Sequence, residues 1–202
     1  MGAARHKKAL LILDMISEFR FPDWKPVLAV ASRIAPAIAR LRERARQAGV
    51  PVIYVNDMQG DWESDQTAFL ERCGSAVARG KGVTRTLCPD ARDYFIFKPK
   101  HSGFYSTSLA TLLELNSIEE LILTGTTSHQ CVLFTAVDAY VRDYRIVVPV
   151  DCIGAATPLQ TKQALFILKE SLRARAPRSS GIRFGSRSKR EASRRAARGT
   201  PT

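Results

Sequence analysis

Cys131 stands where a cysteine can do chemistry. It follows a short apolar run that ends in a turn of small residues, LILTGTTSHQ at 121–130, and it precedes an apolar stretch that suits a buried helix from Val132 to Tyr140. Backbone N–H groups at a helix N-terminus stabilise a thiolate and can bind a developing oxyanion. The pattern therefore predicts a nucleophile, although a buried structural cysteine would fit the same position.

Two further polar residues directly follow apolar runs. Asp14 follows the run at 9–13, and Lys98 follows the run at 94–97. Because open parallel sheets bind ligands beyond the carboxyl ends of their strands, we expect the acid, the amine and the thiol to converge at one crevice. There the carboxylate can take the thiol proton, the ammonium can stabilise both anions, and turn amides can hold an oxyanion. Taken singly, Asp14 could be a helix cap and Lys98 a solvated strand end.

The elements that would position these residues alternate between strands and helices. Short, nearly uninterrupted apolar runs are typical of parallel strands that are covered on both faces. The predicted strands are Ala9 to Leu13, Val52 to Val55, Tyr94 to Phe97, Leu121 to Leu123 and Ile146 to Val150. We therefore predict an α/β fold, a three-layer α-β-α sandwich with a mainly parallel, Rossmann-like sheet.

Helix-compatible spacings of apolar residues separate these runs. They occur at 27–41, at 109–113 and after Cys131, and a last helix is predicted from about Leu159 to Leu172. Pro36 lies inside the first of these segments, where we expect it to break or kink the helix.

The net charge of +12 is concentrated at the C-terminus. Residues 173–202 hold ten Lys or Arg and one acid, which leaves only +3 for residues 1–172. We predict one domain over 1–172 and a disordered basic tail over 173–202, which has too few apolar residues to fold alone. The tail could bind nucleic acid or an anionic membrane, be a plain solvated tail, or be translated in a shifted frame; without interleaved aromatics, nucleic-acid binding is disfavoured.

Composition favours a cytoplasmic protein. No apolar run approaches the length of a membrane span, and the run that follows the basic N-terminal residues is too short for a signal peptide and ends in Asp14. The four cysteines form neither a CxxC pair nor a metal-ligand pattern, which is consistent with a reducing compartment.

Three blocks of this sequence resemble those of the isochorismatase-like cysteine hydrolases, the family of nicotinamidases, N-carbamoylsarcosine amidases, ureidoacrylate amidases and isochorismatases. LLILDMISEF at 10–19 is similar to the family's first strand and its D-x-Q-x-x-F end. KPKHSGFYSTSL at 98–109 is similar to its K-x-x-x-S-x-F-x-x-T-x-L block, and GTTSHQCVLFTAVDAYVRDYRIVVPVDC at 125–152 to its nucleophile block. The resemblance spans about residues 8–172.

The resemblance implies roles for individual residues. Asp14 would be the general base, Lys98 its charge partner and Cys131 the nucleophile. A non-proline cis peptide would join Thr126 to Thr127, and the amides of Thr127 and Cys131 would form the oxyanion hole. It also implies a small-molecule substrate, no cofactor, no membrane partner and a homo-oligomer.

The sequence departs from the family pattern at two places. Ile16 replaces the usual Gln, and we expect it to make that wall of the site more apolar. Metal-binding members place Asp and His together after the second strand, whereas this chain has Asp57 and Asp61 there without a histidine. We therefore predict no catalytic metal, since the chain has only three histidines and no zinc-ligand spacing, at His6, His101 and His129.

Several side chains near the predicted strand ends could line the substrate pocket. Four are aromatic and one is a histidine in the turn before the nucleophile: Phe19, Trp62, Phe104, Tyr105 and His129. Aromatic residues at strand ends are also common core residues, so this pocket is an interpretation from position alone.

These observations together predict a metal-independent cysteine hydrolase that cleaves a C–N bond, amide or carbamoyl, through a thioester on Cys131. Asp14 would serve twice, first protonating the departing amine and then activating water. The alternatives are vinyl-ether hydrolysis of the isochorismatase kind, a Cys-His pair that uses His129 or His101 as its base, and a non-catalytic protein whose tail binds nucleic acid.

Overall fold

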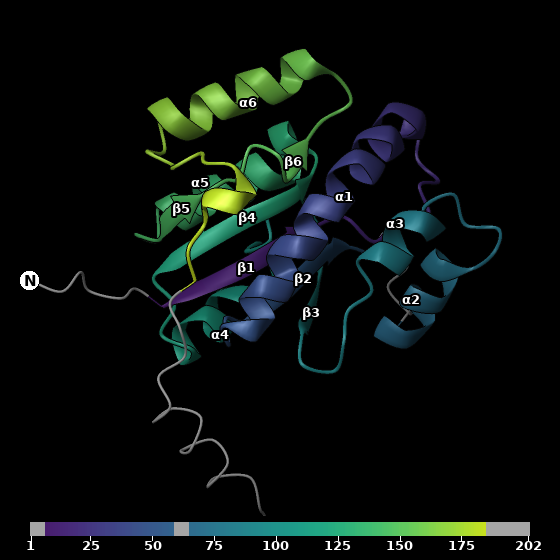
Figure 1. The fold of residues 1–202 in the computed structure, drawn as a ribbon, viewed down its shortest axis with the longest axis horizontal. Coiled ribbons are helices and arrows are strands. Elements are labelled where there is room, and N and C mark those ends of the chain that lie inside the picture. Colours follow the sequence, from purple (N-terminus) through teal and green to yellow (C-terminus); the bar gives the residue numbers. More distant parts are fainter. Residues whose placement is uncertain (1–6, 59–64, 185–202) are drawn as a thin grey trace, which may run out of the picture.

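A computed structural model describes residues 7–58 and 65–184, which form a parallel sheet between two layers of helices (Figure 1). The sheet order is β3-β2-β1-β4-β5, with β6 beside β4, and every strand pair is parallel. The strands are β1 (Lys8–Leu13), β2 (Val52–Asp57), β3 (Tyr94–Lys98), β4 (Glu120–Thr126), β5 (Arg145–Val147) and β6 (Ile153–Gly154). This confirms the predicted α/β sandwich, with the strand order of a doubly wound sheet.

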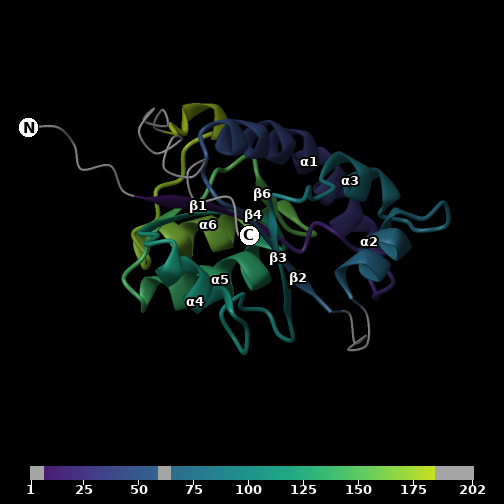
Figure 2. The same ribbon diagram turned by 90° about the horizontal axis from the view of Figure 1, so that it is seen from below.

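Helices cover both faces of the sheet, with α1 on one side and α4, α5 and α6 on the other (Figure 2). Their bounds are α1 (Trp24–Gln47), α2 (Gln66–Gly74), α3 (Lys81–Thr86), α4 (Leu109–Leu115), α5 (Leu133–Tyr140) and α6 (Pro158–Glu170). A π-helical turn (Ser128–Val132) precedes α5, and a 3₁₀ turn (Ser179–Gly181) follows α6. None of the helices in the described ranges is long and apolar enough to span a membrane.

The central strand β1 divides its side chains between two hydrophobic cores. Leu10 and Ile12 pack in the core under α1, whereas Leu11 and Leu13 pack in the core shared with α4, α5 and α6. All four are fully buried, and burial of such a side chain contributes about 1.5–3 kcal/mol. Both faces of β1 are therefore apolar, and its first polar side chain, Asp14, comes where the strand ends.

Pro36 does not break the first helix, which was one of the two outcomes predicted for it. Helix α1 continues through Pro36, which lies on its exposed side. Buried residues before and after it, including Ile34 and Ile38, pack on the sheet and hold the helix together. The missing N–H of one proline costs less than the loss of this packed face.

Helix α5 was predicted to be buried, but one of its sides is exposed. Its small residues Ala136 and Ala139 face the core, whereas Phe134, Val137 and Tyr140 are exposed. The apolar run after Cys131 therefore predicted the helix correctly but did not predict how much of it is exposed.

Residues 173–184 belong to the packed domain, so the predicted boundary at Leu172 falls too early. Arg175 forms a parallel bridge with Val147, and Ile182 is 2% exposed in the core under α1. The Asp151 carboxylate accepts hydrogen bonds from the Ser179 backbone N–H and hydroxyl at 2.7 and 2.8 Å. We call residues 173–184 the C-terminal strap; the rest of the predicted tail, residues 185–202, lies outside the described residues.

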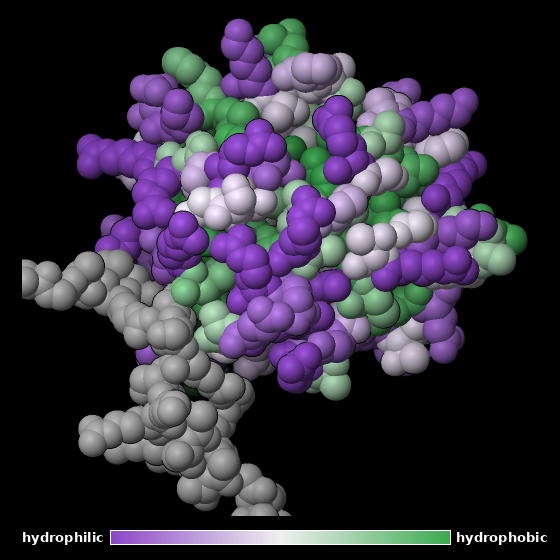
Figure 3. All heavy atoms as spheres, viewed as in Figure 1, coloured by the Kyte–Doolittle hydropathy of each residue, from purple (hydrophilic) through white to green (hydrophobic). Residues whose placement is uncertain are grey.

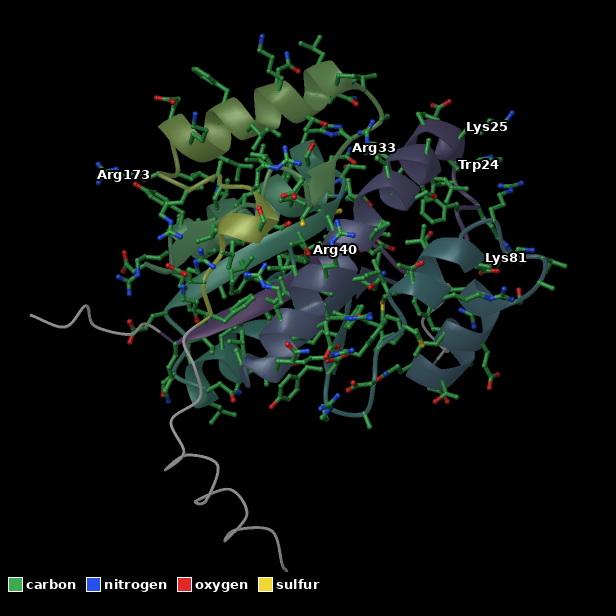
Figure 4. All side chains as sticks on the ribbon, in the orientation of Figure 1. Trp24, Lys25, Arg33, Arg40, Lys81 and Arg173 are labelled. Atoms are coloured by element: carbon green, nitrogen blue, oxygen red, sulfur yellow. The ribbon has the colours of Figure 1, made fainter. Side chains whose placement is uncertain are left out.

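The outer face of α1 is hydrophilic. Lys25, Arg33 and Arg40 project from it, and Arg173 lies beyond the end of α6 (Figure 4). The same view in space-filling form shows hydrophilic side chains with smaller hydrophobic patches between them (Figure 3). Arginine and lysine are thus present on the folded domain as well as in the tail.

Strand β1 lies between β2 and β4, so the chain winds outward from β1 in both directions. At such a switch point the crossovers leave on opposite sides and open a crevice at the carboxyl ends of the strands. In this protein the switch point lies between β1 and β4, where Leu13 and Gly125 are paired in register.

Candidate active site

Asp14, Lys98 and Cys131 meet at this switch point. The Lys98 Nζ atom lies 2.8 Å from Asp14 Oδ2 and 3.6 Å from Cys131 Sγ. The Lys98 side chain is completely buried, and Asp14 retains 17% of its side-chain exposure. The structure thus brings together the acid, the amine and the thiol that the sequence placed after three different strands.

Lys98 reaches the other two residues because its side chain is long. Its strand, β3, is separated from β1 by β2, and Lys98 is paired in register with Asp57 at the end of β2. The side chain crosses the end of β2 and passes 3.9 Å from Asp57 Oδ2. The Lys100 carbonyl accepts a hydrogen bond from Nζ at 3.1 Å, which ties the following loop to the ammonium.

The Asp14 carboxylate is held in one orientation. Asp14 has a left-handed backbone with φ of 49°, a conformation that non-glycine residues rarely adopt. Its N–H donates to the Val55 carbonyl at 3.1 Å, and its carbonyl accepts from the Thr126 hydroxyl at 3.2 Å. The Asp57 N–H donates to Oδ1 at 2.6 Å, so β1, β2 and β4 all fix this residue.

Burial controls the protonation of both acidic groups. It raises the pKa of Asp14, although the Lys98 charge and hydrogen bonds from Cys131 and Lys98 act in the opposite direction. Burial also raises the pKa of the Cys131 thiol far above its usual value, with a further increase from the Asp14 charge and a partial decrease from Lys98. Burial disfavours the Lys98 ammonium, but the neighbouring Asp14 and Cys131 groups outweigh it and raise the pKa of Lys98.

Burial therefore favours the thiol form of Cys131 over the thiolate, next to the Asp14 carboxyl group. This differs from the expectation that the helix start would stabilise a thiolate, because Cys131 itself is buried in the π-helical turn. The nucleophile can then form only when a base takes its proton during attack, and Asp14 is in contact to do so.

The peptide bond between Thr126 and Thr127 is cis, as the resemblance implies. It joins β4 to the π-helical turn, whose first residues are anchored by hydrogen bonds from the Gln130 and Val132 amides to the Thr127 carbonyl at 3.1 and 3.3 Å. This turn places Cys131 beside the end of β1.

Of the two described histidines, His101 contacts the thiol. Its Nδ1 atom lies 3.9 Å from Cys131 Sγ, and its exposed ring packs against Phe134 with centroids 5.4 Å apart. His129 lies in the π-helical turn, and its pKa is lowered by burial and by the proximity of His101. Sequence position alone favoured neither histidine, since their separation from Cys131 along the chain does not determine which ring turns toward it.

The predicted aromatic pocket is not assembled as expected. Phe19 is 1% exposed in the core under α1, and Phe104 is 6% exposed in the other core, where it stacks on Tyr144. Tyr105 is exposed, and Trp62 lies outside the described residues. Phe19 and Phe104 therefore support the walls of the domain and present little surface to a ligand.

Ile16 also belongs to the core and does not form an apolar wall of the site. Its side chain is fully buried among residues under α1. Its carbonyl accepts a hydrogen bond from the Asn56 side-chain amide at 2.7 Å, which holds the loop after Asp14 against the end of β2. The hydrophobic side chain of Ile16 is consistent with a core position. It was instead assigned to the wall of the site because Ile16 is only two residues from Asp14.

The contribution of Asp57 was missed by sequence reasoning, which considered this residue only as a metal ligand. Its backbone amide orients the Asp14 carboxylate, and its own carboxylate faces Lys98. The sequence feature that could have indicated this role is the position of Asp57 at the end of β2, the strand next to β1. In the described ranges no cluster of three or more His, Cys, Asp or Glu side chains is arranged to hold a metal ion.

Comparison with known proteins gives a consistent set of similarities. The Isochorismatase domain family matches residues 8–175. An uncharacterised isochorismatase family protein of Bacillus subtilis (strain 168) is 41% identical over 165 residues, covering 82% of this chain and 90% of the relative. A probable inactive nicotinamidase of Arabidopsis thaliana is 31% identical over 163 residues, covering 74% and 82%. The crystal structure of N-carbamoylsarcosine amidase from Thermoplasma acidophilum has a TM-score of 0.64 and 30% identity, covering 87% of this chain and 98% of its own.

Proposed function

Because this chain belongs to the isochorismatase family, we propose that it is a cysteine hydrolase that cleaves an amide or carbamoyl C–N bond of a small molecule through a thioester on Cys131. The observation that carries this proposal is the contact of Lys98 Nζ with both Asp14 and Cys131 at the carboxyl ends of the strands. A nucleophile in contact with a cation and next to a base can carry out nucleophilic acyl transfer.

Acylation begins with transfer of the Cys131 thiol proton to the Asp14 carboxylate as sulfur attacks the carbonyl carbon. The Lys98 ammonium stabilises the thiolate that develops next to it. The amides of Thr127 and Cys131 would stabilise the tetrahedral oxyanion. Asp14 then returns the proton to the departing amine, the C–N bond breaks, and a thioester remains on Cys131 until water hydrolyses it.

A hydrolysis screen tests this function. Its substrates are nicotinamide, N-carbamoylsarcosine, ureidoacrylate and isochorismate, and an acyl adduct is sought by intact mass after rapid quenching. We expect turnover of at least one amide or carbamoyl compound, an adduct on Cys131, and loss of both in Cys131→Ala. Cys88→Ala, which removes an exposed thiol, is the matched control and should retain activity.

Other outcomes of this screen would replace the proposal. Hydrolysis of isochorismate that survives Cys131→Ala would establish vinyl-ether chemistry without a covalent intermediate. Absence of turnover, together with an unreactive Cys131, would assign this chain to the non-catalytic members that the name of the Arabidopsis relative indicates.

We also propose that the protein is a cytoplasmic homo-oligomer. The oligomer is supported by large apolar side chains that are exposed on two adjacent helices, α5 and α6. They include Phe134, Val137 and Phe166. Light scattering of the purified protein, compared with Phe166→Glu, tests this: the wild type should exceed the mass of one chain and the variant should dissociate. A monomeric wild type would contradict it.

A further inference from the structure

The resting contacts of Asp14 raise the question of which group activates water after acylation. Asp14 Oδ1 accepts from the Asp57 amide and Oδ2 is paired with Lys98, and the side chain is only 17% exposed, so incoming water has little access to this carboxylate. A base that acts on incoming water needs a free lone pair within hydrogen-bond reach of the thioester carbon. One exposed side chain that contacts the sulfur also meets this requirement.

That side chain is His101. Its Nδ1 atom is 3.9 Å from Cys131 Sγ, and its ring is open to solvent. A ring that already contacts the sulfur is within one bridging water of a carbon attached to that sulfur. Lys98 makes no such approach from solvent, because its side chain is buried and its ammonium has no lone pair.

The loop that carries His101 is anchored on both sides. Lys100, which precedes it, accepts a hydrogen bond from the Lys98 ammonium at 3.1 Å. Ser102, which follows it, donates to the Asp138 carboxylate of α5, and the Gly103 amide donates to the Thr135 hydroxyl at 2.9 Å. The ring itself packs on Phe134, so its position over the thiol is set by α5 as well as by the loop.

We propose that His101 is a catalytic residue for deacylation, in which its neutral imidazole takes a proton from the water that attacks the thioester. This proposal rests on the proposed function and replaces the second role that the sequence gave to Asp14. The charged and titratable groups that face the imidazole are the Cys131 sulfur, His129 and, behind the sulfur, Lys98 with Asp14.

The step is balanced without another reactant. Water oxygen forms a bond to the thioester carbon while its proton moves to the imidazole. The C–S bond then breaks, the acid product leaves, and the imidazolium returns the proton to the Cys131 sulfur that it contacts. Asp14 remains a carboxylate throughout, ready to accept the thiol proton of the next cycle.

The test uses p-nitrophenyl acetate, whose phenolate needs no protonation to depart, in a Cys88→Ser background that removes the exposed thiol. The burst of p-nitrophenolate measures acylation, and the steady-state rate measures deacylation. In His101→Gln we expect a burst of wild-type rate and size, a steady-state rate lower by about 100-fold or more, and an acetylated protein visible by intact mass. Arg85→Gln, at an exposed side chain of α3 away from the site, is the control and should behave as wild type.

Chemical rescue separates catalysis from loop structure. Because the ring of His101 is exposed, added imidazole can enter the space left in His101→Ala and should restore the steady-state rate without changing the burst. Asp14→Asn should show the opposite pattern, a slow burst that imidazole does not accelerate.

Each other result has a defined meaning. An unchanged steady-state rate in His101→Gln, an equal loss of burst and steady-state rate, or a failure of imidazole to restore His101→Ala would overturn the role of His101 and leave the thioester mechanism intact. A wild-type protein without a Cys131-dependent burst would instead overturn the proposed function itself.

Discussion

Lys98 Nζ lies 2.8 Å from Asp14 Oδ2, and this contact joins the ends of two strands that are not neighbours in the sheet. The ammonium is completely buried, so the pair exchanges solvation by water for mutual attraction. The same cation touches the Cys131 sulfur, which makes the pair part of the nucleophile's surroundings as well as of the fold.

Removal of the Lys98 charge should therefore affect stability and activity together. In Lys98→Met, Asp14 loses its buried partner, and we expect the free energy of unfolding to fall by about 3–5 kcal/mol in urea titrations. Arg145→Met, which breaks an exposed pair with Glu119, is the control and should change it by less than about 1 kcal/mol. A similar small change in Lys98→Met would contradict the structural role given to this pair.

The pH dependence of acylation should report the raised pKa of Asp14. The carboxylate is the form that accepts the thiol proton, so the acylation rate should fall as pH decreases through a pKa above the usual carboxyl range. The p-nitrophenyl acetate burst measured against pH checks this, and Lys98→Met should move the acid limb to still higher pH because the cation that lowers this pKa is gone. An acid limb at or below the usual carboxyl range would contradict the assignment.

The raised pKa of Asp14 has the opposite consequence for stability: activity should rise with pH, whereas the contribution of Asp14 to stability should fall. Because the pKa of Asp14 is higher in the folded state than in the unfolded chain, the folded state binds this proton more tightly. The contribution of Asp14 to the free energy of unfolding should therefore decrease as pH rises from the unfolded-state pKa to the folded-state pKa. Comparison of wild type with Asp14→Asn across this interval measures the effect, which should be absent in the variant.

Gly125 should tolerate no side chain. Its φ is +114°, and a Cβ atom there would lie 2.0 Å from the Leu13 carbonyl oxygen of the adjacent strand. We expect Gly125→Ala to lose about 1–3 kcal/mol or more of stability and to displace Asp14 enough to slow the burst. Gly82→Ala in α3, where a Cβ would meet nothing within 4 Å, is the matched control; equal thermal stability of the two variants would refute this expectation.

The C-terminal strap should contribute to the stability of the domain. Ile182 is 2% exposed and packs in the core under α1, so Ile182→Ala should lower the free energy of unfolding by about 2–5 kcal/mol. Val77→Ala, at a residue that is 87% exposed, provides the control and should be nearly neutral in the same titration. A neutral Ile182→Ala would show that the strap adds little to the core.

Five of the strands and the three central site residues were accessible from sequence for one physical reason. Parallel strands that are buried on both faces appear as continuous apolar runs, and the first polar residue after each run must lie at the same edge of the sheet. This rule placed Asp14, Lys98 and Cys131 at one crevice, and it also marked Asp57, whose part was recognised only from its hydrogen bond to Asp14.

The burial of individual side chains was harder to predict from the sequence. Phe19, Phe104 and Ile16 lie close to site residues in sequence, yet their side chains turn into the two cores. The strap was assigned to a tail because its composition is basic, although Ile182 and the hydrogen bonds between Ser179 and Asp151 hold it on the domain. Both errors arise because packing depends on partners far away in the chain.

The sequence by itself determined the α/β fold, five of its strands and the convergence of an acid, an amine and a thiol, since periodicity and strand-end position are local properties; α2, α3 and β6 were not predicted. Only the tertiary structure decided that burial raises the pKa of the Cys131 thiol, that Asp57 orients the base and that His101 contacts the sulfur. These depend on desolvation and on distances between atoms from different crossovers, which exist only once the sheet and its two helical layers have assembled.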